Sequence, residues 1–313
     1  MSAIEILRGG AATLVQDLGR PGHSAAGVPR SGAMDPFAAT TANRLVGNAP
    51  DAALLEILLR GPRLRATVPT RAALVGARFA ATLDGRPVRF GERFELPAGS
   101  ELDLGAAIDG ARAFLALGGG LDVPLVLGSR STDLRSGFGG WLGRPLAAGD
   151  RLPLGLARDR PTLVGPVPPF VPRSGSWPLR ALLGPQWERF TAAARTRFFA
   201  AEFRLAAHAD RVGMRLVGPA LPTLAGAEIR PEPAWPGAVQ VPGSGEAIVL
   251  GPDHPSTGGY AKLATVIAAD LPTLAYLRPG DRIRFRPCSL VEARAALAEV
   301  AGAADSRPDE AAR

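Results

Sequence analysis

The density of glycine and proline constrains this chain more than any other feature. The 313 residues include 38 glycines and 30 prolines, and both residue types interrupt helices and central strands. Between them lie short runs of alternating apolar and polar residues, the pattern of half-buried strands. The spacing predicts a mainly β fold of barrels or sandwiches with few helices. Strands are expected at 79–83, 87–90, 94–96, 101–104, 113–117, 238–241 and 247–250.

Local signals place one hairpin and one helix in the first half of the chain. Asp84-Gly85 separates two strand-like runs, and this pair favours a tight turn in which both residues have positive φ. Asp35 precedes Pro36 as an N-cap before a first-turn proline, and an apolar helical stripe then stops at Gly47. We therefore expect a hairpin at Asp84 and a helix beginning at Pro36.

Two further helices are expected in the second half. Gly184-Pro185 precedes a stripe of apolar residues at helical spacing, which predicts a helix opening at this pair. Ser289 and Glu292 form a capping box. The last helix should run from this box to about Val300.

Composition shifts divide the chain into two halves. Residues 157–178 contain a run of prolines that disfavours helix and central strand alike, so we interpret this segment as an extended linker. The halves are then residues 1–156 and 179–301, followed by a polar tail, 302–313, that should be frayed.

Short internal echoes support a two-fold organisation. Residues 146–154 read LAAGDRLPL and residues 277–285 read LRPGDRIRF, so each half places a Gly-Asp-Arg turn before an alternating strand. A second, shorter echo is RLVG at 44–47 and at 215–218. These echoes predict that each half ends in a similar strand.

The charge is basic, and arginine carries almost all of it. The net charge is +7, with Lys262 as the single lysine. Guanidinium groups suit the planar geometry of carboxylate or phosphate, although a GC-rich coding sequence would produce the same skew. The arginines are scattered and aromatic residues make up only 6%, which argues against nucleic acid as a partner.

Cysteine usage and hydropathy limit the cellular compartments in which this chain is expected. Cys288 is the single cysteine, so the chain can form neither an internal disulfide nor a zinc-binding cysteine pair. Residues 1–10 lack the apolar stretch of a signal peptide, and the most apolar late segment, 261–275, is too short and too interrupted to span a bilayer. We expect a cytoplasmic protein without a membrane partner.

Several catalytic mechanisms are excluded because the sequence lacks the motifs that they require. A phosphate-binding P-loop needs Gly-Lys-Ser/Thr, whereas Lys262 follows Ala261. Lys262 also lacks the methionine neighbours of a biotin attachment site, so no covalent biotin is expected on this chain. The nucleophile elbow of α/β-hydrolases is absent. The histidines do not have metal-ligand spacing, and no metal site is predicted from His23, His208 and His254.

Four polar, glycine-rich segments carry the candidate chemistry, and the first is near the N-terminus. It runs over 13–22 and continues through 27–35. A strand, a turn and a helix cap account for part of it, while a substrate site would account for its clustered polar residues equally well. The candidates in this segment are Gln16, Asp17 and Arg20.

The second segment combines Gly118-Gly119-Gly120 with a hydroxyl-rich turn at 128–135. Glycines let main-chain amides approach an anion, and hydroxyls beside arginine add donors, so the segment could bind carboxylate or phosphate. A tight turn with capping hydroxyls is the structural alternative. The candidates are Ser129, Arg130, Ser131, Thr132 and Arg135.

The third and fourth segments lie in the second half. The third, 210–215, is interpreted as an anion site or as an internal ion pair that holds a turn. The fourth, 236–262, brings a carboxylate, hydroxyls and the single ammonium group ahead of an apolar stretch, and Asp253 there suits a general base or a metal ligand. The candidates are Arg211, Arg215, Gln240, Asp253, Thr257, Tyr260 and Lys262.

Taken in order, these segments resemble the family of the 5-oxoprolinase C subunit, also described as biotin-dependent carboxyltransferase-like proteins. The motifs are TLVQDLGRPG, GVPRSGAMD, GSRST, DRVGMRLVG and TGGY, and the resemblance covers about Ile4 to Pro287. The same family includes half of the carboxyltransferase domain of urea carboxylase and the second subunit of allophanate hydrolase-type proteins. Departures from the family pattern occur at 230–233, where a serine hydroxyl is lost, and at 254–256.

The resemblance implies a fold of two cyclophilin-like β-barrel halves. It implies a hydrolase that opens the cyclic amide 5-oxoproline to L-glutamate with ATP and Mg²⁺, in a hetero-oligomer with proteins like the A and B subunits of 5-oxoprolinase. Because this chain has no P-loop, nucleotide or a phosphorylated intermediate would be held by arginines and glycine-rich loops, at the interface with the B subunit. The four segments would then meet around a small anionic substrate.

The resemblance also suggests roles for the candidate residues. Asp17, Asp253 and Lys262 are the predicted catalytic groups, and the remaining candidates are predicted to bind the substrate or an anion. Two alternatives stay open: a carboxyltransferase or allophanate hydrolase-type subunit for a urea-like substrate, and a regulatory partner of the B-subunit-like protein without catalysis.

Overall fold

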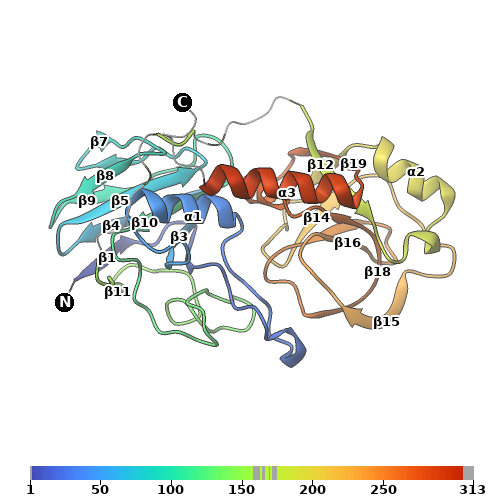
Figure 1. Ribbon diagram of the computed structural model, residues 1–313, viewed down its shortest axis with the longest axis horizontal. Helices are drawn as coiled ribbons and strands as arrows, with labels where there is room; N and C mark the ends of the chain where they lie inside the picture. The colour runs from blue at the N-terminus through green and yellow to red at the C-terminus, as the bar shows by residue number, and fades with distance from the viewer. Residues whose placement is uncertain (1, 158–162, 164–165, 169, 171–174, 306–313) are drawn as a thin grey trace. The chain divides into compact units, whose positions relative to one another are not determined.

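The computed structural model describes residues 2–157, 163, 166–168, 170 and 175–305 (Figure 1). Contacts divide them into two compact units. The first unit is formed by 2–20, the described part of 31–172 and 302–305, and the second by 21–30 and the described part of 173–301. Most of the predicted linker, 157–178, lies outside the described residues, so the predicted boundaries of the halves stay predictions.

The first unit contains two antiparallel sheets. One is built from β1 (Ala3–Arg8), β4 (Arg63–Ala66), β6 (Thr82–Leu83), β7 (Arg86–Pro87), β9 (Glu101–Asp103) and β11 (Arg151–Pro153). The other is built from β2 (Ala12–Gln16), β3 (Leu54–Leu58), β5 (Thr70–Gly76), β8 (Arg93–Leu96) and β10 (Arg112–Leu117). Their strand orders are β11-β1-β4-β9-β6-β7 and β2-β3-β10-β5-β8.

The predicted first helix is confirmed as α1 (Pro36–Leu45), which packs against β5 and β10 (Figure 1). The Asp35 carboxylate accepts hydrogen bonds from the amides of Phe37 and Ala38 at 3.0 and 2.9 Å. The chain leaves the helix through Gly47, whose φ is 78°. Every residue of β10 is buried, as expected for a central strand with one face under a helix.

The predicted hairpin is also confirmed, with shorter strands than expected. Asp84 and Gly85 have φ angles of 48° and 80°, the left-handed pair that a tight two-residue turn requires. Only Thr82–Leu83 and Arg86–Pro87 pair across it. Phe79 instead forms an isolated bridge with Ala107.

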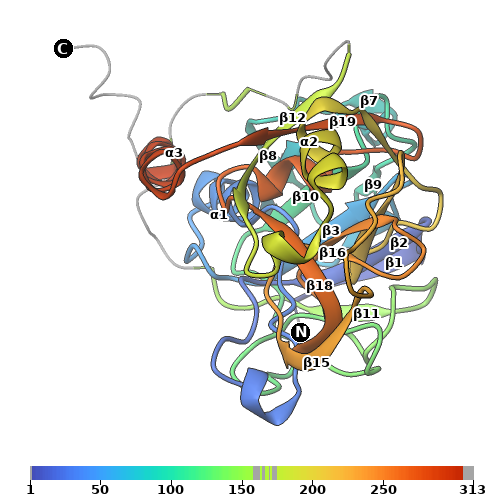
Figure 2. The same ribbon diagram turned by 90° about the vertical axis from the view of Figure 1, so that its right-hand side faces the viewer.

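The second unit is a closed barrel. Its strands are β12 (Trp177–Leu183), β13 (Phe203–Leu205), β14 (Gly213–Val217), β15 (Glu228–Pro233), β16 (Ala238–Val241), β17 (Ala247–Leu250), β18 (Thr257–Val266) and β19 (Arg282–Pro287). They follow the order β12-β19-β13-β14-β17-β16-β18-β15, and a further pairing of β12 with β18 closes seven of them into a ring. The predicted mainly β fold is therefore confirmed. Figure 2 shows β15 beside the extended start of β18.

One helix prediction in this unit is wrong. The helix expected to open at Gly184-Pro185 is divided into a 3₁₀ turn, η2 (Trp187–Arg189), and α2 (Ala192–Ala200). Phe190 between them is extended, with ψ at 146°, and Thr191 then caps α2 by accepting from the amide of Ala194 at 3.1 Å. The apolar stripe was a correct signal, but the local cap at Thr191 restarts the helix.

The capping box predicted for the last helix is confirmed. The Ser289 amide donates to Glu292 Oε2 at 2.7 Å, and the Glu292 amide donates to Ser289 Oγ at 3.3 Å. Helix α3 (Leu290–Asp305) runs beyond the expected end near Val300, and residues 306–313 of the predicted tail lie outside the described residues. Two further 3₁₀ turns are η1 (Ser24–Ala26) and η3 (Leu271–Ala275). No helix in the described part of the chain is long and apolar enough to cross a bilayer.

The Gly-Asp-Arg echo corresponds to the same turn in both units. Gly149 and Gly280 have φ angles of 91° and 90°. Asp150 Oδ2 accepts from the amide three residues earlier at 2.7 Å, and Asp281 Oδ2 does the same at 2.8 Å. Each turn leads into a strand, β11 or β19. The shorter RLVG echo is not structural, because 44–47 ends a helix whereas 215–217 form the last part of strand β14.

The turn of the first unit carries an arginine contact that generates a prediction about pH. Arg144 holds both carboxylate oxygens of Asp150, at 2.7 and 2.8 Å. This hydrogen bonding is the largest cause that lowers the pKa of Asp150, to about 2. Because the folded pKa is depressed, the resulting stability is fully present above the unfolded value of about 3.9 and is lost as pH falls toward about 2.

We expect Asp150→Asn to lower the free energy of unfolding near neutral pH and to lose its difference from the wild type near about pH 2. Urea unfolding at a series of pH values measures both. Arg144→Met is the companion variant, since it removes the arginine contact and keeps the bond from the Ala147 amide to Asp150. Its loss should be smaller and should fade over the same range. A constant difference between wild type and Asp150→Asn across this range would contradict the prediction.

Candidate functional site

The carboxylate of Asp17 organises the predicted site residues of the first unit. Asp17 follows β2 directly and is 8% exposed. Its Oδ1 accepts from the amide of Gly19 at 2.7 Å and from the hydroxyls of Ser129 and Ser131, both at 2.6 Å. Its Oδ2 accepts from the amide of Arg130 at 2.6 Å. These bonds occupy most of the lone pairs of a carboxylate, so Asp17 ties the end of β2 to the 129–131 turn.

The neighbouring polar groups are also engaged within the unit. Thr132 Oγ1 donates to the carbonyl of Val15 at 2.9 Å. The side-chain Nε2 of Gln16 donates to the carbonyl of Thr132 at 3.1 Å. Gln16 Oε1 is buried and has no hydrogen-bond partner in the described part of the chain. Because the hydroxyls of Ser129, Ser131 and Thr132 all donate internally, the contacts fit the capped-turn alternative.

The buried Arg20 lies inside the same group. It is 1% exposed, its Nη2 donates to the carbonyl of Ser131, and its Nε donates to the carbonyl of Val126 at 3.4 Å. Its guanidinium carbon lies 4.8 Å from the centre of the Phe138 ring. Arg20 therefore stabilises the 126–131 segment through hydrogen bonds to its main-chain carbonyls.

The other two arginines of this group are more accessible. Arg130 Nε donates to the carbonyl of Val123 at 2.8 Å, and its Nη2 lies 2.7 Å from the carboxylate of Asp122. Arg135 is exposed, and its amide donates to Asp133 at 3.1 Å. Among the three candidate arginines of the first unit, Arg135 thus has the most exposed side chain. An anion-binding role for Arg135 stays a prediction.

In the second unit, Arg211 and Asp253 form a buried ion pair. Arg211 Nε lies 2.7 Å from Asp253 Oδ2, and Arg211 Nη2 lies 2.9 Å from Oδ1. The side chains are 6% and 2% exposed. The geometry is the internal ion pair that the sequence left open for Arg211. Both carboxylate oxygens of Asp253 accept hydrogen bonds from the Arg211 guanidinium. Asp253 could therefore act as a general base only if this ion pair opened.

The single lysine is fully buried in the same unit. Lys262 lies on β18 with 0% of its side chain exposed, and its Nζ is 2.5 Å from Glu232 Oε1 on β15. It also lies 5.5 Å from the centre of the Trp235 ring. The hydrogen bond from Lys262 is the largest cause that lowers the pKa of Glu232, followed by the hydrogen bond from Gln186. A buried ammonium is costly unless paired, and Glu232 provides the pair.

Two glutamines complete the surroundings of Lys262. Gln186 Oε1 accepts from the amide of Lys262 at 3.0 Å, while its Nε2 donates to Glu232 Oε1 at 2.7 Å. Gln240 on β16 is the cross-strand partner of Lys262, and its buried Nε2 has no hydrogen-bond partner among the described residues. A side chain at Gly258 would collide with that amide, so glycine in the TGGY motif leaves room for it. We call Gln186, Glu232, Gln240 and Lys262 the lysine cluster.

The lysine cluster has the chemistry of a site. It combines a dehydrated ammonium, a carboxylate and an unpartnered amide donor. Positive charge and N–H donors in a buried setting stabilise negative charge that develops on an oxygen far better than they do in water. A carboxylate beside them can accept a proton. The arrangement suits the polarisation of a carbonyl or the binding of an oxyanion.

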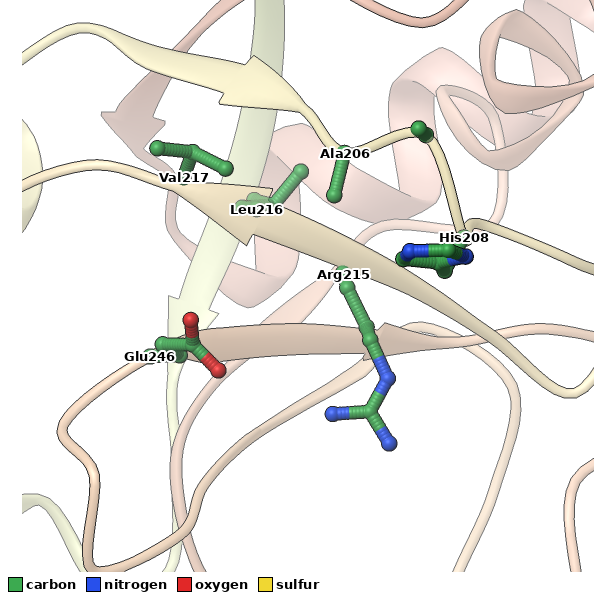
Figure 3. Close-up of a pocket in the computed structure, with 7 residues that line it drawn as sticks. Ala206, His208, Arg215, Leu216, Val217 and Glu246 are labelled. Carbon is green, nitrogen blue, oxygen red and sulfur yellow. The ribbon is translucent and has the colours of Figure 1, made fainter.

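Thr257, Tyr260 and Arg215 lie outside this cluster. Thr257 and Tyr260 are exposed on the part of β18 that pairs with β15. Arg215 projects from β14 toward a pocket of about 540 Å³ (Figure 3). The other lining residues are Ala206, Ala207, His208, Leu216, Val217 and Glu246. The predicted residues of the second unit therefore fall in separate places.

Sequence reasoning missed Gln186, Glu232 and Trp235. Glu232 had a signal, because it lies in the segment that departs from the family pattern. Gln186 and Trp235 stand in ordinary loop contexts, and only strand pairing brings them near Lys262. In the described residues no group of three or more His, Cys, Asp and Glu side chains converges as a metal site would require. A common site for the groups of the two units stays a prediction.

Comparisons with known proteins define the class to which this fold and these motifs belong. The model of the carboxyltransferase domain, subdomain A and B, matches residues 26–287, and the chain belongs to this family. Among curated proteins, the 5-oxoprolinase C subunit of Escherichia coli is 39% identical over 292 residues, covering 93% of both chains. The corresponding C subunit of Haemophilus influenzae is 36% identical, again over 93% of both.

A solved structure extends the likeness to a larger enzyme. Kluyveromyces lactis urea carboxylase superposes with a TM-score of 0.91 and 33% identity. The match covers 97% of this chain and 29% of that protein. The predicted family resemblance is confirmed.

The Asp17 contacts generate a stability prediction. We expect Asp17→Asn to lower the free energy of unfolding by about 2–4 kcal/mol, because an amide presents a donor to buried donors that the carboxylate satisfied. Urea unfolding measures the loss. The control is Asp122→Asn, whose 57% exposed carboxylate makes a surface ion pair with Arg130 and should cost less than about 1 kcal/mol. Equal stability of Asp17→Asn and wild type would contradict a structural role for Asp17.

Proposed function

We propose that this chain is the C subunit of a 5-oxoprolinase that opens 5-oxoproline to L-glutamate. The observation that carries the proposal is end-to-end similarity: the C subunit from E. coli matches over 93% of its own length as well as 93% of this chain. A shared domain inside a larger enzyme would leave much of the relative unmatched. The match instead has the extent expected of the same subunit.

The proposed reaction adds water across an unactivated lactam. The C–N bond of the ring breaks, the carbonyl carbon gains an oxygen from water, and the nitrogen becomes the amine of glutamate. The amide is resonance-stabilised, so we propose that ATP transfers its γ-phosphoryl group to the lactam oxygen, with Mg²⁺ balancing the phosphate charge. ADP leaves first. One water then attacks the phosphorylated carbon and the C–N bond breaks, which gives an acyl phosphate and the free amine. A second water hydrolyses the acyl phosphate to the carboxylate of glutamate and inorganic phosphate.

The lysine cluster is the proposed contribution of this chain to that chemistry. The ammonium of Lys262 and the amide of Gln240 would hold the oxygen on which negative charge develops, at the lactam or at its phosphorylated form. Glu232, held beside Lys262 at 2.5 Å, would accept a proton or fix the ammonium in place. Asp17 and Asp253 are assigned positioning roles, because their carboxylates are occupied by internal contacts.

Partners follow from the same proposal. The relatives are named as one subunit of a larger enzyme, and we propose proteins like the A and B subunits of 5-oxoprolinase as the partners of this chain. ATP and Mg²⁺ would be bound at the interface with the B-subunit-like protein. A cytoplasmic location, where ATP is available, belongs to the proposal.

The likeness to urea carboxylase favours a second candidate. Its TM-score of 0.91 over 97% of this chain supports a carboxyltransferase-type subunit that uses a urea-like substrate. The same lysine cluster would then stabilise the oxyanion of a carboxyl group in transfer. Such a subunit needs a biotin carrier as partner, because covalent biotin is not expected on Lys262.

One experiment separates these functions. The chain is co-expressed with the A and B subunits of 5-oxoprolinase from the same organism, and glutamate release from 5-oxoproline is measured with and without ATP. We expect release that requires ATP and all three proteins. A stable complex without turnover would support a regulatory partner instead. Turnover of urea with a biotin carrier, in place of 5-oxoproline, would support the second candidate.

A substitution tests the role of Lys262 within the complex. We expect Lys262→Met to lower kcat at least about 100-fold, as for the loss of an oxyanion-stabilising donor, while the melting temperature stays near that of wild type. Stability should survive because Glu232 is 37% exposed and water can solvate it once the ammonium is gone. Enzyme kinetics and thermal unfolding provide the two measurements.

Arg112→Met is the matched control with another buried cation. Arg112 lies 3.3 Å from Glu56, and the two side chains are 6% and 3% exposed. Its removal takes the Arg112 counter-charge away from a buried carboxylate and should lower the free energy of unfolding by about 3–5 kcal/mol. If Lys262→Met lost stability like Arg112→Met and kept kcat in the fraction that remains folded, the proposed role of Lys262 would be wrong.

A further inference from the structure

One surface of the second unit is rich in arginine and is used by none of the chemistry above. Arg282, Arg284 and Arg286 alternate along β19 with the buried Ile283 and Phe285. Arg204 occupies the middle of β13 between two buried residues. Because side chains alternate between the two faces of a strand, all four arginines lie on the outer face of the barrel. We call Arg204, Arg282, Arg284 and Arg286 the basic face.

The register of the sheet brings these charges close together. Arg204 on β13 is the direct antiparallel partner of Arg282 on β19. Side chains opposite each other in such a pair have Cβ atoms about 5 Å apart, and like charges there are destabilising. Successive outward residues of one strand are about 7 Å apart. The barrel therefore holds four guanidinium groups on one patch at a cost to its own stability.

Few acidic groups compensate this charge. Arg282 Nη1 lies 3.7 Å from Glu202, whereas no carboxylate of the described residues lies within ion-pair distance of Arg204, Arg284 or Arg286. The pKa of Glu202 is lowered, first by its hydrogen bond from Ser176 and then by the charges of Arg282, Arg204 and Arg284. One carboxylate thus faces several cations.

The neighbouring strand shows how the fold treats an arginine that it does pair. Arg180 on β12 is the register partner of Arg286. It forms a two-pronged contact with Asp270, at 2.6 and 3.1 Å, and its main-chain amide donates to the same carboxylate at 2.7 Å. Internal neutralisation is therefore available at this sheet, and Arg204, Arg284 and Arg286 have no such ion pair among the described residues.

We propose that the basic face docks a carboxylate-rich surface of the B-subunit-like partner, an inference that rests on the proposed function. A guanidinium group forms planar, two-pronged contacts with carboxylates. A row of such groups on a flat strand face suits acidic side chains presented by a strand or a helix. Binding would relieve the repulsion between Arg204 and Arg282, so complementary charge adds to the association.

Protein fits this surface better than single-stranded nucleic acid. Proteins that bind single strands add aromatic side chains on which bases stack. The aromatic residues of β13 and β19, Phe203 and Phe285, are 1% exposed and point into the barrel. The two strands therefore present charge to a partner without a stacking platform.

The test uses Arg204→Gln/Arg284→Gln and Arg204→Glu/Arg284→Glu, which change two arginines that have no internal ion pair among the described residues. The full-length chain is titrated by calorimetry, at low and high salt, with the purified B subunit of 5-oxoprolinase from the same organism. We expect about tenfold weaker binding for the glutamine variant and about 100-fold for the glutamate variant, with wild-type binding weakening as salt rises. The glutamine variant should melt at or above the wild-type temperature, because a repulsion is removed.

Arg86→Gln/Arg93→Gln is the matched control, since both are exposed strand arginines of the first unit. Its affinity for the B subunit should equal that of wild type. If wild type does not bind the B subunit, the proposed complex is wrong and the docking surface with it. If wild type binds and all variants bind equally, only the docking surface is wrong. Loss of binding to a duplex DNA probe, with binding to the B subunit intact, would identify a nucleic-acid surface and overturn the inference. Should the glutamate variant fail to fold, the glutamine variant decides.

Discussion

A charged side chain that leaves water must find its counter-charge or its hydrogen bonds inside the fold, and both units are built around solutions to this constraint. In the first unit the Asp17 carboxylate collects two hydroxyls and two amides, which fixes a long loop to the end of β2. In the second, Arg211 and Asp253 satisfy each other through a two-pronged contact. These contacts add to the main-chain hydrogen bonds that hold the same loops, such as those from Thr132 to Val15 and from Gly251 to Val212.

The same constraint separates polar residues that build the molecule from those available for chemistry. The hydroxyls of Ser129, Ser131 and Thr132 are engaged by Asp17 and by the main chain. Gln16 in the first unit leaves only an acceptor, Oε1, unused, whereas beside Lys262 the unused atom is a donor, Nε2 of Gln240, which has no acceptor among the described residues. Native folds leave few buried polar atoms unsatisfied. An unused donor beside a dehydrated ammonium is therefore a better indication of a ligand site than a motif rich in serine and glycine.

Closure of the barrel is what produces this arrangement. Because β18 pairs with β12 on one side and β16 on the other, Lys262 lies across from Gln240 and away from water. The free start of β18 takes β15 as an extra partner, which delivers Glu232 to the ammonium. The outer face of the same barrel carries the arginines of β13 and β19 with little compensation. The same barrel thus holds a neutralised buried charge on β18 and an open basic surface on β13 and β19.

The sequence by itself determined the features that depend on neighbouring residues. The cap at Asp35, the left-handed turn at Asp84-Gly85, the box of Ser289 with Glu292 and the repeated Gly-Asp-Arg turn each follow from local backbone and side-chain chemistry. Motif order likewise identified the family. The tertiary structure alone decided which polar residues meet, because register and barrel closure join positions far apart in the chain, such as Glu232 with Lys262 and Arg204 with Arg282. No local signal distinguishes an arginine that pairs internally, as Arg211 does, from one left open to a partner.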